Sequence, residues 1–161
     1  MLTVLQESLG EAHGLAIAAA ATVDGVEQRL SDRGLRRRLD GLRLDAAEAR
    51  ARCLDAERGF GDGPAAEILA HANTISDRAA DLAGSWFKAG TGPLTAWTFL
   101  TMAEAGEVAA WGTLRLLAQR DGRLVELAEW GLDVQRRHLE LVLEGIEPLA
   151  ARFEPGSPRW G

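Results

Sequence analysis

The sequence contains no tyrosine, a single cysteine and no long run of apolar residues. Without tyrosine, the chain offers no tyrosyl radical chemistry. Because Cys53 has no second cysteine to pair with, no internal disulfide can form, and this fits a reducing compartment such as the cytoplasm. The longest apolar run, residues 15–23, is mostly alanine and is shorter than the roughly 20 residues that span a bilayer. We therefore expect a cytoplasmic protein that does not enter a membrane.

The chain also lacks an excess of positive charge, since the formal net charge is −6. A nucleic-acid-binding surface would need a basic face, so we expect no nucleic-acid partner. The local exception is residues 36–38 together with Arg43, which are all arginine. Asp40 and Asp45 lie among and beside them, so we interpret this segment as a solvated, salt-bridged helix face.

Helical patterning is what the sequence does contain. Alternating β-branched strand patterns are absent, and apolar residues recur at helical spacing, so the predicted fold class is all-α. Turn and capping signals divide the pattern into helices at about residues 3–30, 35–58, 64–87, 93–119 and 124–152. The third is the weakest, and we interpret it as a surface helix. Asp62 is expected to cap it, with Pro64 in its first turn.

The order of these helices suggests an architecture. Two long helical hairpins, joined by a connection that carries its own extra helix, predict a four-helix up-down bundle with one crossover connection. This is the layout of ferritin-like bundles, in which metal ligands project inward from the long helices. We expect one domain over residues 1–152 and a flexible C-terminal tail, rich in proline and glycine, over residues 153–161.

The candidate site lies in the last two helices. Glu104 and Glu107 occupy the middle of an apolar helix, and Gln135 and His138 share one face of the next. Glu107 and Gln135 are equally far in sequence from the turn at Asp121, and so are Glu104 and His138. Antiparallel partners at equal distance from a turn lie at the same height, so the two pairs are predicted to face each other in one layer.

A longer motif carries a resemblance to a known family. The stretch Glu104-Ala-Gly-Glu107-Val-Ala-Ala-Trp111-Gly-Thr-Leu114 resembles the Glu-x-x-Glu-Ile-Ala-x-Tyr-Gly-Thr-Leu segment of the ferritin-like superfamily, nearest the YciF-like bacterial stress-protein branch. Trp111 stands in the tyrosine position, and Ala105 stands where that branch tends to carry histidine. The resemblance covers residues 94–150 and implies a ferritin-like bundle, iron or manganese bound between helices, and a stress-related function.

The ligand set that the resemblance implies is incomplete. Its metal ligands would be Glu104, Glu107 and His138, with Gln135 in place of an acid and Glu48 or Asp45 from the second helix. The first helix has alanine at the level where a ligand acid is expected. Its nearest candidates, Glu11 and His13, lie about a turn too far away. A complete di-metal site is therefore not expected, and a single-metal or empty site remains open.

Two metal-free interpretations stand beside the metal site. In the first, the bundle is a binding or assembly module, and the polar layer is a buried hydrogen-bond network in which the glutamates pair with Arg115, with an arginine of the second helix or with His138. In the second, Glu104 and His138 form an acid–base pair of an enzyme acting on a small apolar substrate. We interpret Cys53 as a small buried hydrophobic residue. The alanine-rich first helix and the tryptophans suggest a homodimer.

Overall fold

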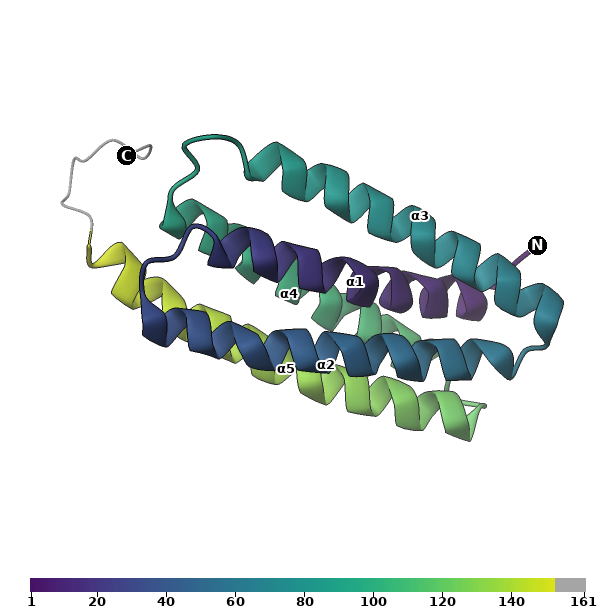
Figure 1. Ribbon diagram of the computed structural model, residues 1–161. Helices are drawn as coiled ribbons and strands as arrows, with labels where there is room; N and C mark the ends of the chain where they lie inside the picture. Colours follow the sequence, from purple (N-terminus) through teal and green to yellow (C-terminus); the bar gives the residue numbers. More distant parts are fainter. Residues whose placement is uncertain (153–161) are drawn as a thin grey trace.

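The computed structural model describes residues 1–152, and this part of the chain is all-helical. It contains α1 (Val4–Glu27), α2 (Arg33–Arg58), α3 (Asp62–Trp86), α4 (Pro93–Leu117) and α5 (Gly122–Ala150). Successive helices run in opposite directions (Figure 1). The all-α prediction is thereby confirmed. The predicted tail, residues 153–161, lies outside the described residues. Over residues 1–152 no helix is long and apolar enough to cross a membrane.

Side-chain caps define where several helices begin. Thr3 caps α1, and its hydroxyl and the Gln6 side chain form a reciprocal capping box. Asp32 caps α2 by accepting a hydrogen bond from the backbone N–H of Leu35 at 2.9 Å. Asp121 caps α5 in the same way, at 3.1 Å. Each cap satisfies an N–H group that the first helical turn leaves without a partner.

Two predicted helix boundaries are wrong. The first helix ends at Glu27 rather than near residue 30, because the backbone amides of Arg29 and Leu30 bond in a tighter turn to the carbonyls of Val26 and Glu27. Asp62 does not cap α3, since it is already the first helical residue. The cap position belongs to Gly61, whose φ of +87° lies in the left-handed region that favours glycine.

Helix α1 is the central helix of the assembly. It packs against α2, α3 and α4, while α5 packs against α4 and α2. Helix α3 therefore lies outside the four-sided group formed by α1, α2, α4 and α5, and it covers α1 (Figure 1). This approach is close, because a Cβ atom added at Gly14 would lie 2.4 Å from the carbonyl oxygen of Ala72. The prediction that α3 is a surface helix thus holds for its outer face only.

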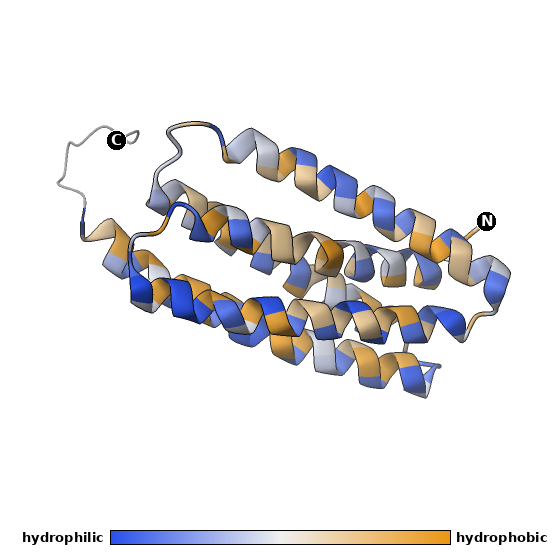
Figure 2. Ribbon diagram, viewed as in Figure 1, coloured by the Kyte–Doolittle hydropathy of each residue, from blue (hydrophilic) through white to orange (hydrophobic). Residues whose placement is uncertain are grey.

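The buried core consists of two apolar clusters. One surrounds Trp111 near the α4–α5 turn, and the other surrounds Trp97 towards the opposite end of α4. Polar residues of α4 and α5 occupy the sequence between them. The helices also differ in hydropathy: in Figure 2 the first half of α2 is strongly hydrophilic, whereas the middle of α1 is apolar. Arg36 and Arg43 in that half of α2 pair with Glu27, as expected of a salt-bridged face.

Candidate functional site

A layer of polar side chains crosses the bundle between the two apolar clusters. Glu104 and Glu107 from α4 and Gln135 and His138 from α5 are each at most 6% exposed. The α2 residue Asp45 reaches the same layer from the protein surface, with its side chain 35% exposed. The predicted register of α4 and α5 is confirmed, because Glu107 contacts Gln135 and Glu104 contacts His138.

The imidazole of His138 lies between acids of two other helices. Its Nε2 is 2.9 Å from Oδ2 of Asp45, and its Nδ1 is 3.2 Å from the amide oxygen of Gln135 and 3.4 Å from Oε2 of Glu104. Burial disfavours the charged imidazole, but its interactions with the nearby acids Glu104 and Asp45 outweigh burial and raise the pKa of His138. The cationic form of His138 therefore joins α2, α4 and α5.

The side chain of Gln135 connects His138 to Glu107 by hydrogen bonds. Its amide oxygen accepts from His138, and its amide nitrogen donates to Oε2 of Glu107 at 2.8 Å. Burial, together with the neighbouring charge of Glu104, raises the pKa of Glu107 well above its ordinary value of 4.5. The layer thus holds adjacent carboxyl groups in different environments, and Glu107 keeps its proton to a higher pH than an exposed glutamate does.

Other sequence candidates do not join the layer. Glu48 lies on the outer side of α2, where it is bonded to Arg52 at 2.8 Å. Glu11 is exposed on α1. Arg115, considered as a partner for the glutamates, instead lies 3.6 Å from Glu129 at the surface.

A second buried pair was not predicted. Nδ1 of His13 on α1 lies 2.5 Å from Oε1 of Glu57 on α2, and both side chains are almost fully buried. Glu57 lies one helical turn beyond Cys53, on the apolar face of α2, and that spacing was the available signal. Cys53 is fully buried as predicted. Burial and the charges of Glu57 and Glu107 raise the pKa of its thiol, so it remains protonated.

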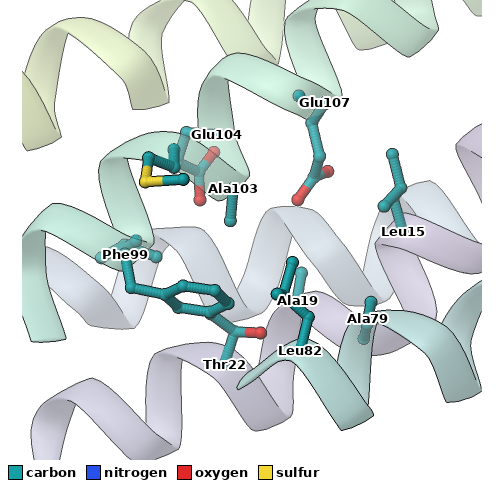
Figure 3. Close-up of a pocket in the computed structure, with 13 residues that line it drawn as sticks. Leu15, Ala19, Thr22, Ala79, Leu82, Phe99, Ala103, Glu104 and Glu107 are labelled. Carbon is teal, nitrogen blue, oxygen red and sulfur yellow. The ribbon is translucent and has the colours of Figure 1, made fainter. Parts of the chain in front are cut away.

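A cavity of about 220 Å³ opens beside the polar layer, between α1, α3 and α4. Its walls are mostly apolar, and they include Leu15, Ala19 and Phe99. Glu104 and Glu107 are the ionisable residues of the lining, and Figure 3 shows both carboxyl groups directed into the space between the helices. The cavity was not predicted, because it is formed by the position of α3 over α1.

One oxygen at this end of the cavity lacks a partner. Oε2 of Glu104 is inaccessible to solvent and has no hydrogen-bond donor among the described residues. The nearest cationic group, Nδ1 of His138, is beyond ordinary hydrogen-bond length at 3.4 Å. A buried carboxylate oxygen left unpaired is costly, so this atom marks a position where a donor would be stabilising.

The residues of the layer do not fit the di-metal centre that the resemblance implies. Both ring nitrogens of His138 already face protein acceptors, and none of the α1 residues that line the cavity with Glu104 is an acid or a histidine. Over residues 1–152, no three His, Cys, Asp or Glu side chains are grouped so that they hold a metal ion. We therefore derive no chemistry through a metal at this layer.

Comparisons with protein-family models, with curated proteins and with solved structures found no match to this chain. The resemblance to the ferritin-like superfamily therefore depends on the α4 motif and stays a prediction. What can be argued about function has to come from the polar layer and the adjoining cavity.

Proposed function

We propose that this protein is a metal-free bundle of ferritin-like arrangement that binds a small molecule in the cavity between α1, α3 and α4. The arrangement is supported by the two antiparallel pairs α1–α2 and α4–α5, with α3 as the helix of the crossover connection. The observation that carries the binding function is the cavity itself. Its apolar walls end on two buried carboxyl groups, Glu104 and Glu107.

The network explains how carboxyl groups are kept at the inner end of an apolar cavity. His138 and Gln135 hold them from the α5 side, and Asp45 holds His138 from α2. A pocket with apolar walls and a few fixed polar groups is the usual form of a small-molecule site. Leu82 and Met102, each 53% exposed, belong to its lining and give it an apolar entrance.

The volume limits the size of the ligand. Engineered protein cavities of about 150 Å³ bind benzene, so a cavity of about 220 Å³ accommodates a monocyclic or short-chain molecule. Benzyl alcohol is a suitable neutral probe. We expect it to bind with a stoichiometry of one per chain, detected by calorimetry, and to perturb NMR resonances of α1, α3 and α4.

A plug variant tests the location of this binding. Ala103 lines the cavity, so Ala103→Leu fills part of it, whereas Ala109→Leu on the exposed side of α4 changes the same helix without entering it. We expect Ala103→Leu to abolish binding of benzyl alcohol and Ala109→Leu to leave it unchanged. If the wild-type protein does not bind benzyl alcohol, or if the two variants bind it equally well, the proposed function is wrong.

A further inference from the structure

The cavity has a polar feature that a neutral apolar ligand would leave unused. Glu104 and Glu107 lie one turn apart on α4 in the same lining, and both carboxyl groups are directed into the space between the helices (Figure 3). Glu104 is 2% exposed and Glu107 is 4% exposed, so water compensates neither of them well. A ligand that brings hydrogen-bond donors and positive charge to this point would complete both groups.

We infer that the cavity binds a small primary amine, whose ammonium group lies between Glu104 and Glu107 and whose short apolar body lies against Leu82 and Phe99. This inference rests on the proposed function, because it names the class of ligand for the same cavity. An ammonium group carries three donors and no acceptor, which matches a site that offers carboxylate oxygens. An anionic ligand is disfavoured, because it would place a further negative charge beside the two acids.

The walls supply no competing cation. Helix α1 contributes aliphatic side chains and the hydroxyl of Thr22, and α3 contributes Ala79 and Leu82. The nearest cation is the imidazole of His138, which is already shared between Glu104 and Asp45. With Glu107 protonated, one imidazolium faces the two carboxylates of Glu104 and Asp45. When Glu107 ionises, the positive charge of an ammonium group offsets the added negative charge.

Proton exchange follows from this charge balance. In the free protein, burial and the charge of Glu104 favour the protonated form of Glu107. When an ammonium group enters, it stabilises the ionised form, so the Glu107 proton leaves to solvent while the amine stays protonated. The net result is release of a proton for each amine bound, at pH values where free Glu107 is protonated.

The titratable and charged groups around Glu107 are few. Glu104 lies beside it on α4, and His138 on α5 is connected to it through Gln135, with Asp45 of α2 behind His138. Cys53 lies near it on α2, next to the His13–Glu57 pair. The residues that α3 contributes to the cavity lining are not ionisable. The Cys53 thiol stays protonated, so it does not compete for the exchanged proton. Between about pH 5 and about pH 8, affinity for an amine should therefore rise as Glu107 becomes easier to ionise.

Calorimetry with benzylamine and benzyl alcohol, which have similar shape and size, tests the inference. At about pH 8 we expect benzylamine to bind about ten-fold more tightly than benzyl alcohol, because hydrogen bonds to charged groups are the stronger ones. The ratio of the two affinities should decrease towards about pH 5. At the lower end of this pH range, where free Glu107 is protonated, repeating the benzylamine titration in buffers of different ionisation enthalpy should show release of close to one proton per amine. Glu107→Gln should remove both the preference and the proton release, and Ala109→Leu should retain both.

The outcomes separate the two proposals. If benzyl alcohol binds in the cavity and benzylamine binds no better, the amine inference is overturned and the proposed function stands. Tighter binding of benzylamine without proton release also overturns it, because the exchange at Glu107 is then absent; this measurement needs only the wild-type protein. If neither probe binds, both proposals fail.

Discussion

Nε2 of His138 on α5 lies 2.9 Å from Oδ2 of Asp45 on α2, so a single imidazole links the two helical hairpins. On its other side the same ring faces Gln135 and Glu104. Because Asp45 is partly exposed while the others are buried, this pair is the point at which the polar layer meets solvent. Substitutions in the layer should therefore affect both titration and stability.

The charge of Asp45 should be measurable in the titration of His138. The pKa of His138 is raised in the folded protein, so we expect an NMR titration to place it above 6.5. Asp45→Asn removes one of the stabilising charges and should lower that pKa. Asp133→Asn, at an exposed pair with Arg136 on the same helix, is the control. An equal shift in both variants would contradict the role of Asp45.

The same titration should appear in stability against pH. A group with a raised folded-state pKa adds stability that is fully present below its unfolded-state value and is lost as the pH rises through the folded-state value. We therefore expect the contribution of His138 to the free energy of unfolding to decrease above about pH 6.5. The decrease should be smaller in Asp45→Asn. Urea denaturation at a series of pH values measures both curves.

The buried His13–Glu57 pair should respond differently to single and double substitution. Removing one partner leaves the other buried without compensation, so Glu57→Ala should destabilise the fold by about 3–5 kcal/mol. Replacing both residues with leucine removes both polar groups and should recover most of that loss. Denaturant unfolding of the single and double variants tests this. Additive losses would show that the two side chains do not act as a pair.

Gly131 should tolerate no side chain. A Cβ atom there would lie 2.2 Å from Cε3 of the fully buried Trp111, so Gly131→Ala should cost about 1–3 kcal/mol of stability. Gly41→Ala is the matched control, because it lies mid-helix in α2 with nothing within 4 Å of the added atom. It should stabilise the protein by about 1 kcal/mol, the usual gain for a helix interior. Thermal or urea unfolding measures whether the free energy of unfolding decreases in Gly131→Ala and increases in Gly41→Ala.

Metal analysis tests the expectation that comes from the ferritin-like resemblance. We expect purified protein, both as isolated and after anaerobic loading with iron or manganese, to hold far less than one metal per chain, because His138 is occupied by protein acceptors. His138→Ala should leave this result unchanged. One or two metals per chain, lost in His138→Ala, would instead support a metal centre and overturn the metal-free proposal.

The sequence was most informative where a short turn joins two long helices. Counting outward from Asp121 placed Glu104 opposite His138 and Glu107 opposite Gln135, and the structure has both pairs in contact. A tight turn leaves little freedom in the relative height of its two helices. The number of residues between a side chain and the turn therefore predicts which residue of the other helix lies opposite it. The ligand set implied by the resemblance included Asp45 from α2 but did not distinguish it from Glu48.

The features that were missed depend on how distant segments approach. Helix α3 has few large apolar residues, so nothing in its own pattern indicated how closely it lies on α1. That approach depends on Gly10 and Gly14, where the absence of a side chain is what matters. The cavity depends on how α3 lies over α1 and α4. The His13–Glu57 pair depends on the register of α1 and α2, whose connection begins after Glu27, earlier than predicted. Their positions follow from packing of the whole bundle.

The central place of α1 has a consequence for the order in which the protein is made. Val4–Glu27 is synthesised before α2, α3 and α4, yet its buried surface is shared among these three helices. Its last partner is complete only when synthesis has reached Leu117. Until then part of the alanine- and glycine-rich face of α1 remains uncovered on the nascent chain, so α1 waits for three later helices before its native surroundings are complete.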